Sequence, residues 1–95
     1  MSKQIWKYAL NINETKLEMP DQAMVLSVGT QSDNIYLWAL VDTELANTIR
    51  IFYTRGTGWD IEKPVEYLFP IGTVQMQSGL VFHVFEEDGC GVLDC

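Results

Sequence analysis

The stretch IYLWALV, residues 35–41, is apolar at each of its seven positions. Its aromatic and β-branched side chains predict a β-strand that needs cover on both faces. A second stretch, LVFHVF at residues 80–85, is also apolar on both faces apart from His83. Two such strands need more cover than one thin core supplies in a chain of 95 residues. Either a compact barrel with a short helix over one face or self-association would cover them, and we expect a homo-oligomer that buries an apolar sheet surface.

The rest of the chain divides into short runs of β-forming residues separated by turn residues. We expect strands at residues 5–12, 15–19, 24–31, 35–41, 48–54, 71–77 and 80–86. Asn13 and Glu14 predict a hairpin turn after the first run, and Ser78–Gly79 predicts a two-residue turn before the last. Residues 42–47 indicate a loop or a single helical turn, and residues 65–68, after Pro64, indicate a short helical turn. The pattern favours a mainly β fold of about seven mostly antiparallel strands, in a sandwich or a small open barrel.

Length and composition indicate one domain, over residues 1–86, because no linker or repeat divides the chain. Residues 87–95 carry two glycines and the cysteines Cys90 and Cys95, and we expect a loosely ordered acidic tail there. In a reducing compartment both thiols stay reduced by default, while the sequence leaves open whether they pair.

The formal net charge is −7, from 13 acidic and 6 basic residues. This field repels phosphate backbones and argues against binding to a nucleic acid polymer. Only Ile5 and Trp6 are apolar between Lys3 and Lys7, so the start of the chain does not resemble a signal peptide. No apolar run approaches the roughly 20 residues that span a bilayer. We expect a cytoplasmic protein that makes no contact with a membrane.

His83 is the only histidine of the chain, and it lies in a strongly apolar strand. Nucleophilic catalysis needs a hydroxyl or thiol beside a base that a third group orients, and simple phosphodiesterases bring two histidines to the phosphate. We therefore expect no enzyme and no catalytic residue. His83 is interpreted as half-buried and bonded to neighbouring backbone or to a carboxylate. The chain also lacks a set of metal ligands, so neither a metal nor a cofactor is expected.

The segment RGTGW, residues 55–59, combines a cation, two glycines, a hydroxyl and an aromatic plane. These are the parts of a small nucleotide or phosphate pocket, although the segment matches neither a P-loop nor a dinucleotide fingerprint. A turn that ends a strand, with glycines at positive φ, is the alternative. Candidate ligand-binding residues are Arg50, Arg55, Gly56, Thr57, Gly58, Trp59 and His83. Candidate interface or core residues are Trp6, Tyr8, Trp38 and Phe82.

Seven short phrases occur in a characteristic order along the chain. They are IWKY (5–8), EMP (18–20), VLSV (25–28), LWALVD (37–42), GTG (56–58), IGTV (71–74) and VFHVFE (81–86). In this pattern the chain resembles a family of small uncharacterised proteins that occur widely in tailed bacteriophages and prophages. The resemblance covers residues 5–86 and brings no catalytic residues with it. It implies a small accessory protein that works in the cytoplasm of a host cell.

Three binding roles are consistent with these observations. The first is a non-enzymatic phage protein that counteracts a host defence, by sequestering a nucleotide-like signal at the interface of a homo-oligomer. The second is an interaction module whose acidic surface blocks a host defence protein. The third is a component of the virion or of its assembly. The first two put the partner in the host cytoplasm.

Overall fold

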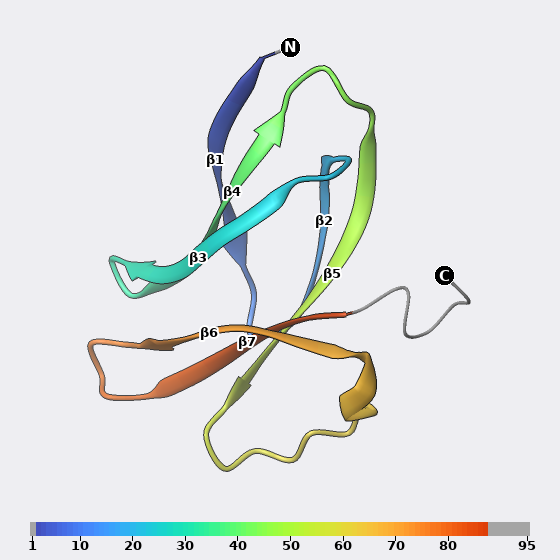
Figure 1. Cartoon of the computed structure of the whole chain (residues 1–95). Coiled ribbons are helices and arrows are strands. Elements are labelled where there is room, and N and C mark those ends of the chain that lie inside the picture. The colour runs from blue at the N-terminus through green and yellow to red at the C-terminus, as the bar shows by residue number, and fades with distance from the viewer. Residues whose placement is uncertain (1, 88–95) are drawn as a thin grey trace.

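The computed structural model describes residues 2–87. These residues form seven strands, arranged in two antiparallel sheets, and one short 3₁₀ helix (Figure 1). The strands are β1 (Lys3–Leu10), β2 (Asn13–Pro20), β3 (Met24–Gln31), β4 (Asn34–Asp42), β5 (Asn47–Gly56), β6 (Leu68–Gln75) and β7 (Val81–Glu87). One sheet has the order β1-β4-β3, and the other has the order β2-β5-β7-β6. The predicted mainly β fold is confirmed, and the described strands do not close into a barrel.

The first predicted hairpin is wrong, because β1 and β2 belong to different sheets. β1 pairs with β4, from Lys3 opposite Asp42 to Leu10 opposite Ile35, whereas β2 pairs with β5. This long-range pairing places Leu10 and Ile35 together in the core. A local hairpin would leave the apolar β4 without its second neighbour. The chain changes sheet near Asn13, whose φ of 84° lies in the left-handed region.

The core lies between the two sheets and uses alternate residues of β4. Ile35, Leu37 and Val41 are almost completely buried there, together with Ala39. The intervening side chains of β4 point to the opposite face of the sheet and are half-buried, so the described chain covers that face only in part. The core itself is thin, since the shortest dimension of the backbone is 16 Å.

The main contact between the two sheets is the one between β3 and β6. A Cβ atom added at Gly72 would lie only 2.9 Å from Cγ2 of Val28. The pairing of β6 with β7 shifts register between Pro70 and Gly72. A bulge on an edge strand tolerates proline, which has no N–H to donate.

Both observed hairpins depend on residues with positive φ. Ser32 and Asp33 have φ values of 50° and 61°, which the twist of a two-residue turn between β3 and β4 requires. Beyond the ends of β6 and β7, the Met76 N–H still donates to the Leu80 carbonyl at 2.8 Å, so the turn itself has three residues, 77–79, rather than the two predicted. Gly79, at φ 95°, donates its N–H to the Met76 carbonyl at 2.9 Å. Glycine adopts this conformation without the steric cost that other residues meet.

Strand β5 extends beyond its predicted end at residue 54. Arg55 and Gly56 are its last two residues and pair with His83 and Phe82 of β7. The turn predicted to begin at Arg55 therefore begins only at Thr57. Pairing with β7 keeps the chain extended past the point where the two glycines predicted a break.

The remaining segments contain little regular structure. The 3₁₀ helix η1 (Val65–Tyr67) confirms the turn predicted after Pro64. Of the predicted segment 42–47, residues 43–46 form a loop without a helix, while Asp42 ends β4 and Asn47 begins β5. Glu87, expected at the start of the tail, is the last residue of β7. Cys90 and Cys95 lie outside the described residues. Among residues 2–87, no helix is long and apolar enough to cross a membrane.

Candidate functional site

The end of β5, the turn that follows it and β7 enclose a depression of about 210 Å³. Its lining residues are Arg55, Gly56, Thr57, Gly58, Trp59, Ile61, His83 and Phe85. Six of the seven residues predicted to bind a ligand therefore come together. The pairing of Arg55 with His83 across β5 and β7 is the reason, because it brings two distant segments of sequence side by side. Among the described residues, no three His, Cys, Asp or Glu side chains are grouped so that they could hold a metal ion.

The ring of His83 lies between two hydroxyl groups. Its Nε2 atom is 2.6 Å from Oγ1 of Thr57, and its Nδ1 atom is 3.2 Å from Oγ1 of Thr73. A neutral imidazole donates from one nitrogen and accepts at the other, so two hydroxyls satisfy it completely. The prediction of a backbone or carboxylate partner is therefore wrong. The hydroxyls belong to the turn after β5 and to β6, which flank β7.

Arg55 is almost buried, with 8% of its surface exposed, and both of its Nη atoms donate hydrogen bonds. Nη1 donates to the carbonyls of Asn13 at 2.6 Å and Thr54 at 3.2 Å. Nη2 donates to Oε1 of Glu62 at 2.6 Å, and this hydrogen bond lowers the pKa of the Glu62 carboxyl. The guanidinium also lies over the ring of Tyr53, 5.4 Å from its centroid. The positive charge that the sequence predicted for a ligand is thus paired within the chain.

Trp59 packs against the backbone of Gly56. A Cβ atom at Gly56 would lie 2.6 Å from Cε2 of the indole, so only glycine leaves room for the ring. The indole meets Phe82 edge-on, with centroids 5.7 Å apart, and it remains 46% exposed. The backbone N–H of Trp59 donates to the Gly56 carbonyl at 3.0 Å, in a turn where Gly58 has a φ of 88°. Residues 55–59 thus include a glycine turn and also line a depression, so both interpretations of this segment have support.

A second depression, of about 310 Å³, also has Trp59 in its wall. Its lining residues are Gly56, Thr57, Trp59, Gly79, Leu80, Val81 and Phe82. The half-exposed indole thus borders both depressions. The hairpin turn between β6 and β7 supplies the far side of the second one.

Arg50 lies apart from these depressions. Its Nε and Nη2 atoms donate to the two carboxylate oxygens of Glu86, and Nη1 donates to the Ala23 carbonyl at 2.5 Å. The hydrogen bond with Glu86 raises the pKa of Arg50. Of the two roles that the sequence left open for Arg50, pairing with a carboxylate is the observed one. The nearby Tyr8 hydroxyl is buried without a hydrogen-bond partner in the described chain, and burial raises its pKa.

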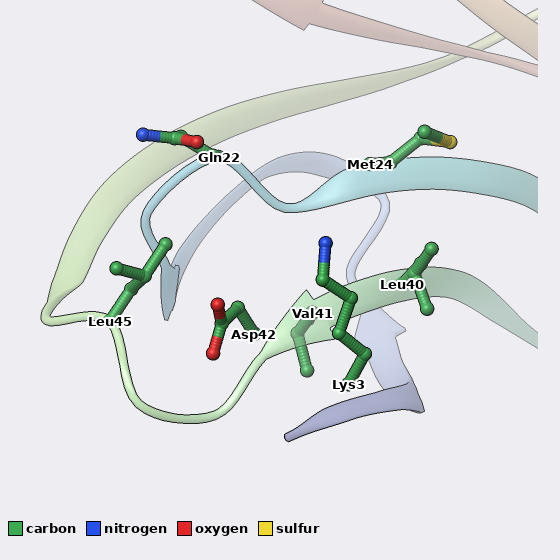
Figure 2. Close-up of a pocket in the computed structure, with 7 residues that line it drawn as sticks. All are labelled: Lys3, Gln22, Met24, Leu40, Val41, Asp42 and Leu45. Atoms are coloured by element: carbon green, nitrogen blue, oxygen red, sulfur yellow. The ribbon is translucent and has the colours of Figure 1, made fainter. Parts of the chain in front are cut away.

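A third depression, of about 340 Å³, lies at the opposite end of the molecule, where β3 begins and β4 ends. Its lining residues are Lys3, Gln22, Met24, Leu40, Val41, Asp42 and Leu45 (Figure 2). Figure 2 shows the side chains of Lys3 and Asp42 extending toward the space below the turn that carries Gln22. Asp42 is nearly buried and accepts a hydrogen bond from the Glu44 N–H at 3.0 Å. The sequence predicted no ligand residue here, because the lining comes from four separate segments.

The face of the three-stranded sheet turned away from the core is largely apolar, and we call it the outer face. It carries Tyr36, Trp38 and Leu40 of β4, and opposite Leu40 lie Ile5 of β1 and Met24 of β3. Ile5 and Met24 are 61% and 58% exposed, and the three β4 side chains are half-buried. The outer face continues into the third depression, since Met24 and Leu40 line both.

The four candidate interface or core residues occupy different places. Phe82 is buried in the core, whereas Trp38 lies on the outer face above Gly29, where an added Cβ would be 3.3 Å from the indole. Trp6 is 38% exposed on the edge strand β1, and its indole N–H donates to the Gln4 side chain at 2.7 Å. Tyr8 is half-buried and packs against the core.

Comparison with known proteins gives one match. The model of the family DUF7352, described as a domain of unknown function, matches residues 1–90. No curated protein and no solved structure matches the chain. The family match includes all seven strands and both sheets, and its description names no activity, ligand or partner.

Proposed function

We propose that this chain, which belongs to the DUF7352 family, is a non-enzymatic binding protein whose ligand site lies around Trp59 and His83. One observation carries the proposal: a half-exposed indole stands beside an imidazole and a hydroxyl that are already oriented, 2.6 Å apart. A flat ligand can stack on the indole while its polar edge forms a hydrogen bond with the Thr57 hydroxyl, which His83 orients.

The size of the depressions limits the ligand. Pockets for drug-sized molecules usually measure roughly 300–1,000 Å³. The depression beside His83 is about 210 Å³ and therefore fits a single ring system, and the one beyond Trp59 is about 310 Å³. A nucleotide-like molecule with two planar parts could use both, one on each side of the indole. This size agrees with a small nucleotide signal better than with a polymer.

The surroundings of His83 support binding rather than catalysis. In nucleophilic sites a carboxylate or amide orients the second ring nitrogen and stabilises the charged imidazolium. Here Thr73 occupies that position with a neutral hydroxyl, 3.2 Å from Nδ1. The nearest ion-paired carboxylate of this site, Glu62, is engaged by Arg55. The arrangement positions a hydrogen-bonding edge.

Calorimetric titration with a panel of nucleotides tests this function. The panel contains adenosine, adenosine monophosphate, cyclic dinucleotides and ADP-ribose. We expect at least one member to bind, and Trp59→Ala to weaken that binding about fivefold or more, because stacking on an aromatic ring contributes on the order of 1–3 kcal/mol. Trp6→Ala is the matched control, since Trp6 has similar exposure on the distant β1. Absence of heat with every member would refute the proposal.

A second candidate function is self-association through the outer face, which the exposure of Ile5 and Met24 favours. Two copies of an acidic chain repel one another least where the surface is apolar and carries positive charge. Lys7 lies on this face with its ammonium 4.6 Å from the centroid of Tyr36, and Lys3 stands at its end. Light scattering should show a dimer or larger oligomer that Trp38→Ser converts to monomer and Trp6→Ser does not. A monomeric wild-type chain at high concentration would exclude this candidate.

The biological setting of the proposal comes from the phage-protein resemblance of residues 5–86. A chain that sequesters a nucleotide signal in the host cytoplasm would counteract a defence system that uses the signal. A chain that blocks a host protein with its acidic surface would instead associate more slowly as salt rises. A virion component would be found in purified particles by mass spectrometry. Phage infection of host cells that express wild-type or Trp59→Ala protein separates the first role from the other two.

A further inference from the structure

We propose that Arg55 is an anion-binding group and that the Glu62 carboxylate occupies its place in the free chain, so that an anionic ligand binds by displacing Glu62. The inference rests on the proposed function of the depression around Trp59 and His83. It adds the chemical class of the ligand: a small molecule that joins a flat ring to a phosphate or a similar anion.

Arg55 is held firmly by the strand on which it lies. It is 8% exposed, and the Asn13 and Thr54 carbonyls fix Nη1 at 2.6 and 3.2 Å. The ring of Tyr53 lies against the guanidinium. These contacts orient the charge while leaving it uncompensated, because carbonyl oxygens and an aromatic ring carry no full negative charge. A buried guanidinium without an anion is costly, so this position requires a negatively charged partner.

Glu62 supplies that partner from a more exposed segment outside the two sheets. Its side chain is 60% exposed and belongs to the irregular stretch between β5 and η1. Only Oε1 accepts a hydrogen bond from Arg55, although a guanidinium and a carboxylate can form two parallel bonds. The pair is thus asymmetric, with a fixed cation and an exchangeable anion. A phosphate offers more acceptor oxygens to the guanidinium than the single oxygen that Glu62 uses.

The lining of the depression supplies the other contacts that such a ligand needs. Arg55, Thr57, His83 and Trp59 border the same space of about 210 Å³. An anion bound to Arg55 in this depression could also accept a hydrogen bond from the Thr57 hydroxyl, whose proton is available when Nε2 of His83 donates to Oγ1. A ring attached to it would reach the exposed face of Trp59. The net charge of −7 over the whole chain still disfavours a polyanion, which selects for a small ligand.

The tether makes Glu62 an effective competitor. Glu62 lies seven residues after Arg55 in the chain, and a short flexible linker gives its carboxylate an effective concentration on the order of millimolar or higher. An anion must outcompete that concentration, so wild-type affinity for a simple anion should be weak. Removing the carboxylate charge should then raise the affinity by about tenfold or more.

Titration with inorganic phosphate and with adenosine monophosphate, followed by NMR at the Arg55 side-chain N–H, tests the inference. Glu62→Gln removes the charge and keeps the side-chain size, and we expect about tenfold tighter binding of both anions. Glu66→Gln is the matched control, because Glu66 is an exposed acid on η1 and its substitution changes the net charge equally. Arg55→Lys keeps the positive charge but loses the planar fork, and we expect the gain to disappear in Arg55→Lys combined with Glu62→Gln. Equal effects of Glu62→Gln and Glu66→Gln would overturn the inference.

Adenosine, which lacks the phosphate, separates this inference from the proposed function. Adenosine binding that Trp59→Ala weakens, with no gain for phosphate in Glu62→Gln, would refute the displacement of Glu62 and leave the ligand site intact. Phosphate binding that Glu62→Gln strengthens, without any effect of Trp59→Ala on adenosine monophosphate, would support the anion site and refute the stacking role of Trp59.

Discussion

Arg50 and Glu86 form a two-pronged ion pair across β5 and β7, with Nε donating to Oε2 at 2.5 Å and Nη2 to Oε1 at 2.8 Å. A third hydrogen bond, from Nη1 to the Ala23 carbonyl, connects the pair to the segment between β2 and β3. Both side chains are about four-fifths buried, at 22% and 19% exposure. Arg50 thus joins β5 and β7 of the larger sheet to the segment that leads into β3 of the smaller sheet.

Arg50→Met should therefore destabilise the fold by about 3 kcal/mol, because it leaves a largely buried carboxylate without its cation. Lys16→Met is the control, since the Lys16 ammonium is 3.9 Å from Glu14 and both side chains are well exposed. Such surface pairs contribute at most about 1 kcal/mol. Urea unfolding gives both values, and equal stabilities of the two variants would contradict the structural role of Arg50.

Gly72→Ala should destabilise the chain by about 1–3 kcal/mol, because its methyl would lie 2.9 Å from Val28 where β6 approaches β3. Val28→Ala removes the obstructing methyl groups at the cost of some core packing. If the contact is the cause, the double variant should lose less free energy of unfolding than the two single variants added together. Simple additivity in urea unfolding would place the cause elsewhere.

Tyr53 makes the fold sensitive to alkali. Burial, with a further contribution from the hydrogen bond that its hydroxyl donates to Glu87 at 2.6 Å, raises its pKa to about 12. An unfolded tyrosine titrates near pH 10. Because the folded pKa is the higher one, the stabilisation is complete below pH 10 and is lost as pH rises from about 10 toward 12.

Tyr53→Phe should weaken that alkaline loss, because phenylalanine has no proton to release. The measurement is the free energy of unfolding between pH 8 and pH 11, in wild type and variant. Tyr8, whose pKa is also raised by burial, should leave part of the slope in the variant. An unchanged slope in Tyr53→Phe would show that Tyr53 ionises equally easily in the folded and unfolded chains.

Local pattern predicted the positions of the strands, because the unbroken apolar run IYLWALV and the alternation in the other β-forming runs depend only on neighbouring residues. It did not predict that β1 pairs with β4, since the run at residues 5–12 alternates equally well in a local hairpin. Choosing between the two pairings requires knowing which long-range partner buries Leu10, and sequence periodicity does not contain that information. The extra residue of the last turn was missed for a related reason, as Gly79 suits two-residue and three-residue loops.

The candidate site, too, was predicted from the sequence only in part. Residues 55–59 were identified because glycines, a cation and an aromatic ring stand next to each other in the sequence. The pairing of Arg55 with Glu62 was not predicted, because it depends on how the irregular segment after β5 folds back over the strand. The hydroxyl partners of His83 were missed because Thr57 and Thr73 become its neighbours only through the sheet order. Sequence spacing identifies the candidate residues of a site, whereas the tertiary fold determines which of them already have partners within the chain.

Gly56→Ala should separate ligand binding from stability. Its methyl would lie 2.6 Å from the Trp59 indole, which is nearly half exposed and can swing outward without opening the core. We therefore expect a stability loss below about 1 kcal/mol, the range of changes that leave core packing intact. The displaced indole should be quenched more readily by acrylamide in a background where Trp6 and Trp38 are phenylalanine.

The same variant should weaken adenosine monophosphate about as much as Trp59→Ala does, because it moves the stacking surface that the ligand needs. Gly29→Ala provides the control, as it places a methyl 3.3 Å from Trp38 on the other sheet and should leave nucleotide affinity unchanged. Normal nucleotide binding by a Gly56→Ala protein with a displaced Trp59 would mean that the ligand contacts Thr57 and His83 but does not stack on the indole.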